Sequence, residues 1–170
     1  SIDQPCFYEV EEYLDISDYY LNTGSPEKGL SVLRKSLIHY PGNEELLLSL
    51  AGLLIFVYDF EEAKDIIDSL EGCEDSEYIY LRAQLVYAIE KDVNEAERLF
   101  SKWLKTEEEL NRYEYEEDEA ETRMRGNYVH ILMSFIQLSD NCDRELLASW
   151  IDEYISRFTP LGICESDYIV

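Results

Sequence analysis

Basic residues are scarce in this sequence. Its 170 residues include 14 Lys and Arg against 38 Asp and Glu, so the formal net charge is -24 at pH 7. Nucleic acids and anionic membrane surfaces are bound largely through cationic side chains. The charge balance therefore argues against both as partners.

Long apolar runs are also absent. The longest, Leu46–Tyr58, contains Ser49 and Gly52 and has 13 residues, whereas a membrane span needs about 20. No basic segment followed by a cleavable apolar stretch is visible, so no signal peptide is predicted. The chain starts at Ser1 without Met and ends on an apolar stretch, from which we expect a fragment of a longer protein, located in the cytoplasm.

Cysteine and histidine are too few and too scattered to indicate a chemical site. The four cysteines form no C-x-x-C pair, and neither histidine lies near a cysteine in the sequence. Zinc sites need clustered ligands, and disulfide frameworks are typical of small secreted chains. The motifs of zinc proteases, α/β-hydrolases, P-loop NTPases and dinucleotide-binding enzymes are missing. We expect free thiols, no metal, no cofactor and no enzymatic activity.

Small residues recur within apolar helical patterns at nearly constant intervals. Intervals of 32 to 34 residues separate the members of two sets: Ser17, Ala51 and Ala83, and Gly29, Ala63 and Ala96. Larger residues follow at the same intervals, as in Leu33, Ile67 and Phe100. Because several sets of positions repeat at the same intervals, the pattern indicates a duplicated structural unit.

Each unit has the pattern of two amphipathic helices joined by a short turn. In the first unit the break is Thr23–Glu27, where Gly24 suits the end of a helix and Pro26 the first turn of the next. The later units break at Asp59-Phe60 and at Lys91–Val93. The interval from Ala83 to Ala96 is one residue longer than in the earlier units, which predicts an extra residue near Glu90-Lys91. An ungapped register would instead place Gln84, and not Ala83, at the small-residue position.

The segment Leu21–Gly29, closing on Pro41–Asn43, resembles the tetratricopeptide repeat (TPR), and so does Ala51–Ala63. The family has a small residue in the middle of the first helix and another early in the second, where the two helices approach closely. The resemblance implies an all-α solenoid of antiparallel helix pairs, a TPR-like superhelix. We expect recognisable repeats at residues 7–41, 42–73 and 75–105.

The repeat pattern changes after Lys105. Apolar residues continue at helical spacing from 106 to 138, which predicts one long helix, or two with a bend at Gly126-Asn127. A turn and a further helix follow, ending before Pro160. We expect a degenerate fourth pair at 106–160 with a long first helix, and 161–170 as a cap or the start of another repeat, all within one domain.

The resemblance implies a concave face, lined by the first helices, that holds a segment of another protein. Counting from the small residue of each first helix predicts nine positions on it, which we call the groove positions: Leu14, Asp18, Leu21, Leu48, Gly52, Ile55, Tyr80, Gln84 and Tyr87. These are apolar, aromatic or acidic, so the carboxylate clamp of one TPR subfamily is not expected. The groove is either open or covered by the 106–138 helix or by further chain.

Residues 107–121, the acidic segment, hold nine carboxylates. They form either a solvated helix face or a docking surface for a basic partner, with tyrosines adding cation–π contacts. The docking residues would be Tyr113, Glu114, Tyr115, Glu116 and Glu117.

Three functions remain open at this point, one of them a helical enzyme that uses the carboxylates of the acidic segment to bind a metal ion. The leading hypothesis is a protein-interaction adaptor that binds a polypeptide segment with basic flanks in the groove. The alternative is a structural spacer or regulatory domain that positions a catalytic or DNA-binding domain elsewhere in a longer chain. The sequence predicts neither the partner's identity nor the oligomeric state.

Overall fold

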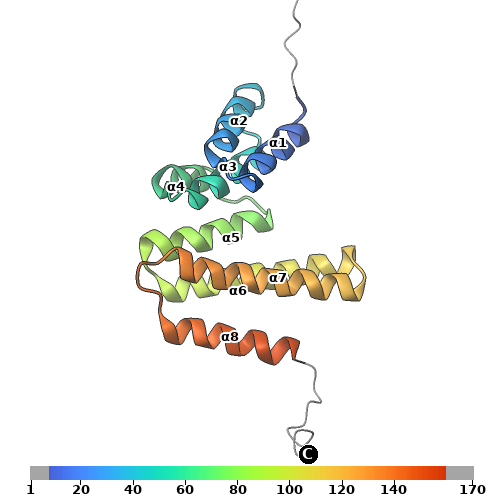
Figure 1. Cartoon of the computed structure of the whole chain (residues 1–170), viewed down its shortest axis with the longest axis vertical. Helices are drawn as coiled ribbons and strands as arrows, with labels where there is room; N and C mark the ends of the chain where they lie inside the picture. The colour runs from blue at the N-terminus through green and yellow to red at the C-terminus, as the bar shows by residue number, and fades with distance from the viewer. Residues whose placement is uncertain (1–7, 160–170) are drawn as a thin grey trace, which may run out of the picture. The chain divides into compact units, whose positions relative to one another are not determined.

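The computed structural model describes residues 8–159, which form α-helices and one π-helical turn without any strand (Figure 1). The all-α prediction is confirmed. In chain order the elements are α1 (Val10–Asn22), α2 (Pro26–His39), α3 (Glu44–Phe56), α4 (Phe60–Ser69), α5 (Ser76–Leu85), the π-turn η1 (Val86–Glu90), α6 (Val93–Glu114), α7 (Glu117–Gln137) and α8 (Arg144–Phe158).

Side-chain caps set the starts of several helices. The side chains of Asn43, Asp75 and Asp143 accept hydrogen bonds from backbone N–H groups in the first turns of α3, α5 and α8. These bonds satisfy donors that have no partner inside the helix. Pro26 occupies the first turn of α2, where its missing N–H costs nothing.

The three predicted turns between paired helices share one backbone conformation. Gly24, Tyr58 and Lys91 all have positive φ, of 76°, 64° and 57°. In the first two turns the hydrogen bonds also correspond, because the amides of Ser25 and Asp59 donate to carbonyls five residues back. This left-handed residue closes a helix end in the Schellman manner.

The small residues predicted at close helix contacts are all buried. Gly29 shows why: a β-carbon built on it would lie 3.2 Å from the carbonyl oxygen of Ser17 and 2.9 Å from a methyl group of Leu53. The α1 and α2 backbones therefore approach at a point where only a very small side chain fits.

Contacts between helices follow the order of the chain from α1 to α5. Each helix packs on the next one, and α3 also contacts α1 and α5. The ring of Tyr80 on α5 packs against Phe100 and Trp103 in the first half of α6. Neighbouring pairs thus bury their apolar sides against each other, with α3 in the middle.

The extra residue of the third unit lies in the π-turn η1. The predicted insertion is confirmed, but it lies inside the helix, just before the left-handed Lys91. A π-turn accommodates one additional residue without breaking the helix. Val86, Tyr87 and Ala88 remain buried as a result.

The prediction for the helices after Lys105 is wrong in its boundaries. The second helix of the third pair does not stop there, because α6 runs without interruption to Glu114. The chain breaks instead at Tyr115-Glu116, where Glu116 is extended and precedes α7. The chain does not divide into two helices at Gly126, which lies inside α7. One glycine costs a helix only about 1 kcal/mol, and the buried Met124 and Tyr128 on either side hold this one in place.

The chain divides into two compact units, where the sequence predicted one domain. The first extends to Trp103 and the second starts at Leu104, so the division falls within α6. The second unit therefore contains the end of α6, α7 and α8, with Tyr128, Phe135 and Trp150 in its core. The predicted cap or further repeat at 161–170 lies outside the described residues.

The shared turn geometry predicts opposite effects of two substitutions. Lys91→Gly should raise the free energy of unfolding by about 1 kcal/mol, because glycine adopts positive φ without steric cost. Gly24→Ala should lower it by a similar amount, although no atom lies within 4 Å of the added β-carbon. Urea unfolding followed by circular dichroism measures both, and stabilisation by Gly24→Ala would contradict the assignment.

A second pair of variants tests the close approach of α1 and α2. Gly126→Ala should stabilise by about 0.5–1 kcal/mol, because the added β-carbon meets nothing within 4 Å in a helix interior. Gly29→Ala should be less favourable than Gly126→Ala by about 1 kcal/mol or more, since its β-carbon crowds Ser17 and Leu53. Equal stabilisation by the two variants, measured by the same urea titration, is the contradicting result.

Candidate functional site

Three of the nine groove positions are buried. Leu48 and Ile55 of α3 and Tyr87 of η1 have almost no exposed surface. The prediction that these three residues line an accessible groove is wrong, because α3 packs against α1, α2, α4 and α5, and these contacts bury Leu48 and Ile55. The π-turn likewise keeps Tyr87 in the core.

The other six groove positions retain exposed surface. Asp18 is exposed, and the remainder are half-buried: Leu14, Leu21, Gly52, Tyr80 and Gln84. The amide of Gln84 donates to the hydroxyl of Tyr80 at 3.2 Å, and the Tyr80 ring lies 4.4 Å from that of Trp103. The accessible positions thus lie on α1, α3 and α5, of which α3 contacts both others.

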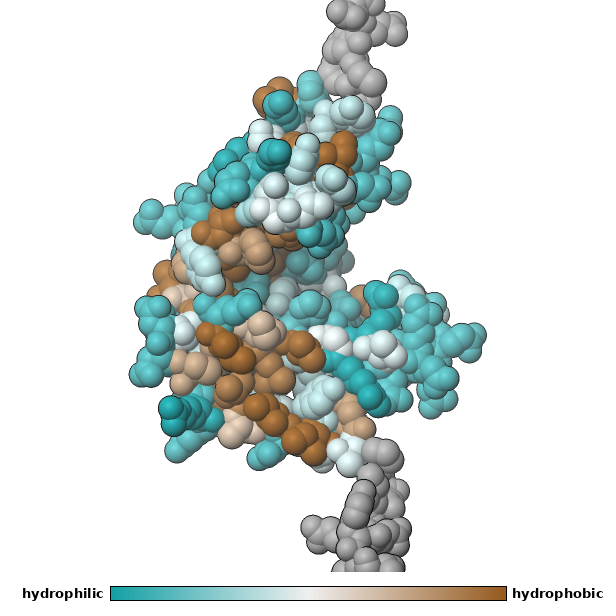
Figure 2. Space-filling model, viewed as in Figure 1, coloured by the Kyte–Doolittle hydropathy of each residue, from teal (hydrophilic) through white to brown (hydrophobic). Residues whose placement is uncertain are grey.

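The acidic segment forms the end of α6, the break and the start of α7. Tyr113 is 88% exposed, and Glu114, Glu116 and Glu117 are exposed beside it. Tyr115 differs, because it is half-buried and the Arg123 guanidinium lies 4.1 Å from its ring centre. One of the two predicted stacking tyrosines is therefore already in contact with a cation of the chain itself. Figure 2 shows that this end of the α6–α7 pair, at the right, is strongly hydrophilic.

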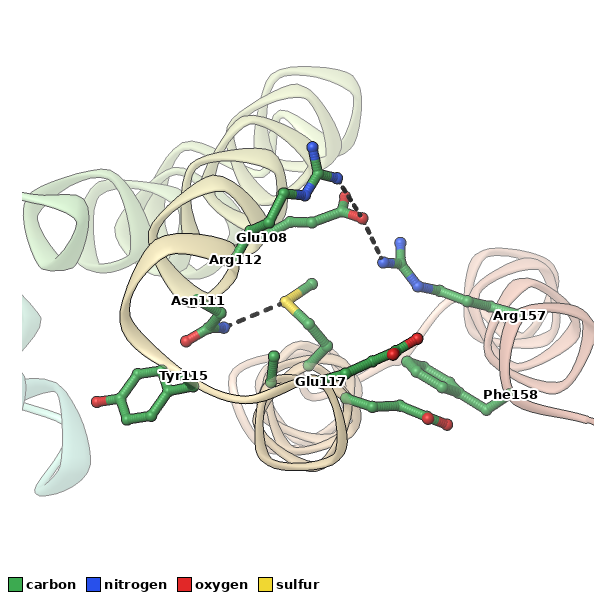
Figure 3. A pocket seen from close by; sticks show the side chains of 10 residues that line it. Glu108, Asn111, Arg112, Tyr115, Glu117, Arg157 and Phe158 are labelled. Carbon is green, nitrogen blue, oxygen red and sulfur yellow. Dashed lines mark hydrogen bonds and ion pairs between the residues drawn. The ribbon is translucent and has the colours of Figure 1, made fainter.

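A pocket of about 600 Å³ opens beside the acidic segment, between the end of α6, the start of α7 and the end of α8 (Figure 3). Its lining combines carboxylates, two arginines and apolar groups: Glu108, Asn111, Arg112, Tyr115, Glu117, Ala120, Glu121, Met124, Arg157 and Phe158. Of the predicted docking residues it includes Tyr115 and Glu117. Sequence reasoning missed the α8 residues of the lining, since nothing local in the chain connects them to positions 33 to 50 residues earlier.

Glu108 balances both arginines of the pocket. Its carboxylate pairs with Arg157 at 2.8 Å and with Arg112 at 3.7 Å (Figure 3). Asn111, only 3% exposed, accepts a hydrogen bond from Arg123 and donates one to the sulfur of Met124. The polar groups at the back of the pocket are therefore satisfied by each other.

Aromatic packing supports the pocket from the core of the second unit. The Tyr128 ring lies 5.6 Å from Phe158 and 6.1 Å from Trp150, and its hydroxyl donates to Glu153 at 2.8 Å. Burial, and then the hydrogen bond to Glu153, raises the pKa of Tyr128 above its ordinary value of 10.0. The phenol therefore remains neutral and holds α8 against α7.

The exposed apolar side chains of α7 and α8 form a further surface that the sequence analysis did not identify. Val129, Met133 and Ile136 repeat at helical spacing on α7, and Ile151 and Ile155 do so on α8. Since α7 and α8 pack on each other, the two stripes belong to one helix pair. Apolar side chains at such spacing are suited to contact with another helix.

Residues 8–159 have neither a cluster of metal ligands nor a helix suited to cross a membrane. No group of three or more potential metal ligands occurs there. None of the helices in this range has the length and apolar character that a membrane crossing requires. Cys73 and Cys142 carry free thiols, and the other two predicted free thiols, Cys6 and Cys164, lie outside the described residues.

Comparison with known proteins identifies no relative. No protein-family model matches the chain, and no curated protein or solved structure matches it either. The resemblance to the TPR family therefore rests on the residues of the chain alone.

The Tyr128 hydroxyl makes the second unit sensitive to alkaline pH. Below pH 10 tyrosine is neutral in both the folded and unfolded states, so the Tyr128 contribution to stability is fully present. Above pH 10 the unfolded chain loses the proton first, so the free energy of unfolding decreases until the raised folded-state pKa is passed. Tyr128→Phe should cost about 1 kcal/mol at pH 7 and reduce this alkaline loss.

The measurement is urea unfolding between pH 7 and 11. Tyr113→Phe is the matched control, because this side chain is 88% exposed and its removal should change stability little. An alkaline loss in Tyr128→Phe as steep as in the unchanged protein would show that the buried phenol is not its source.

Proposed function

We propose that this chain is a non-catalytic protein-interaction module, built as a TPR-like solenoid of antiparallel helix pairs, that binds a polypeptide segment along its first helices. The observation that carries the proposal is the repeated turn at Gly24, Tyr58 and Lys91, each followed by a buried small residue five residues later. Equivalent units of this kind bury their apolar sides by packing on their neighbours.

The packing of the first unit supports this architecture. The first helices, α1, α3 and α5, contact each other in order, while α2 and α4 lie beside them as second helices. Proteins built from stacked helix pairs bind their partners on such extended surfaces rather than in enclosed cavities. The unpaired Cys73 and Cys142 agree with a reducing compartment such as the cytoplasm.

The accessible groove positions define the chemistry of the bound segment. Leu14, Leu21 and Tyr80 offer partly exposed apolar surface, and Asp18 adds an exposed carboxylate on α1, between Leu14 and Leu21 in sequence. Burying two or three apolar side chains of a partner at about 1.5–3 kcal/mol each supports micromolar affinity once the cost of association is subtracted. We therefore expect an apolar segment with basic flanks.

The spacer function is the second candidate. The exposed apolar stripes of α7 and α8 favour it, because a module that positions another domain needs an apolar face on which that domain packs. This candidate predicts that α7 and α8, and not the groove positions, carry the contact.

Selection of a peptide library against the immobilised chain tests the groove. Peptides with apolar centres and basic flanks should be enriched, and Leu21→Glu and Tyr80→Glu should each weaken the selected peptides about tenfold or more, because each places a charge where an apolar side chain binds. Isothermal titration calorimetry measures the affinities.

Ile38→Glu provides the matched control. It introduces the same charge on α2 at a side chain that is 75% exposed and outside the groove positions. Equal weakening by all three variants would reflect net charge alone and would remove support for the groove. Peptides that are indifferent to groove variants but sensitive to Ile151→Glu would favour the spacer function.

A further inference from the structure

The pocket of the second unit combines an apolar wall with an acidic opening. Met124 is buried at its back, while Ala120 and Phe158 are half-buried. The exposed carboxylates of Glu117 and Glu121 belong to the same lining. A side chain with a long aliphatic stem and a charged end matches this order of apolar and acidic groups.

The carboxylates of the pocket lining and the arginines that pair with them are equal in number, three each, and the surrounding acidic segment supplies the excess of negative charge. Glu108 is shared by Arg112 and Arg157, and Glu121 pairs with Arg125 at 2.6 Å. The carboxylate of Glu117, which is exposed, takes part in none of the ion pairs among the described residues. The acidic segment as a whole has nine carboxylates and one basic residue, Arg112. A positive charge that enters the pocket therefore meets an available carboxylate within a negative field.

The aromatic groups of this region already contact cations of the chain itself. The guanidinium groups of Arg125 and Arg157 lie 5.2 Å and 5.6 Å from the centre of the Phe158 ring. The guanidinium group of Arg123 likewise lies over the ring of Tyr115. Planar cations of the chain itself therefore already pack on both rings. Tyr113, 88% exposed at the end of α6, offers one more aromatic ring nearby.

We propose that this pocket receives a lysine or arginine side chain from a basic segment of a partner protein. The proposal deepens the function proposed above and rests on it, because it assigns the basic part of the bound polypeptide to the second unit. The aliphatic stem packs on Met124 and Phe158, the cation pairs with Glu117, and neighbouring basic residues of the partner lie along the exposed carboxylates of the acidic segment.

A polypeptide fits this surface better than a small cation or a nucleic acid. The carboxylates extend beyond the pocket to Glu114, Glu116 and Asp118, so several linked positive charges are accommodated at once. Phosphate groups are repelled by the same carboxylates. No metal-ligand group occurs among residues 8–159, and a metal ion would make no use of the apolar wall.

The test measures fluorescence anisotropy of a labelled peptide with lysines and arginines around one central leucine. It should bind the intact chain, and a matched peptide with glutamine at every basic position should not. Glu117→Gln should weaken binding about threefold or more, since it removes the unpaired carboxylate of the pocket. Ala120→Phe, which fills the pocket without changing the charge, should weaken it about tenfold.

Glu119→Gln is the matched control, because it removes the same charge from the same helix turn at an exposed residue outside the pocket lining. It should weaken binding less than twofold. Equal effects of Glu117→Gln and Glu119→Gln, unchanged binding in Ala120→Phe, or equally tight binding of spermine would each overturn the proposal. If only the groove variants weaken peptide binding, the pocket is excluded while the interaction function stands; if nothing binds, both fail.

Discussion

The close approach of paired helices at small side chains is the constraint on which the first unit depends. At Gly29 the α2 backbone lies so near Ser17 of α1 that an added methyl group would crowd a backbone carbonyl. The corresponding alanines of the next two pairs, Ala63 and Ala96, are fully buried. This spacing lets larger apolar residues such as Leu33, Ile67 and Phe100 pack as a continuous core. The accessible groove positions owe their placement to the same contacts.

The excess of acidic side chains is the second property that shapes the molecule. Most of the arginines pair with carboxylates of the chain itself, as in Arg34–Glu62, Arg82–Glu90 and Arg98–Glu95. Exposed pairs of this kind add little to stability, typically about 0–1 kcal/mol each. Since acidic residues outnumber basic ones, 38 to 14, many carboxylates remain for solvent or for a partner. The acidic segment concentrates this surplus of carboxylates beside a pocket. A basic partner would therefore be attracted over a long range to the same place where a side chain can fit into the pocket.

Two departures from a regular repeat show how the chain keeps its core when the spacing changes. In the third pair the additional residue is taken up by η1, and the left-handed Lys91 still ends the helix. After this pair, α6 continues for more than two further turns to Glu114, because residues 104–114 contain no proline or glycine to stop it. The extension brings Asn111 into contact with Met124 of α7.

The sequence by itself determined the features that depend on neighbouring residues: helical periodicity, the turns near Gly24, Asp59 and Lys91, and the small residues at 32- to 34-residue intervals. These follow from local backbone preferences and from a repeated pattern, both readable in one chain. Only the tertiary structure decided which groove positions are accessible, because the burial of Leu48, Ile55 and Tyr87 depends on helices from other parts of the chain. The tertiary structure also determined that a pocket forms, because Arg157 and Phe158 of α8 line it together with Glu108 of α6 and Met124 of α7. Contacts between residues so distant in sequence depend on how whole helices pack, which local patterns do not encode.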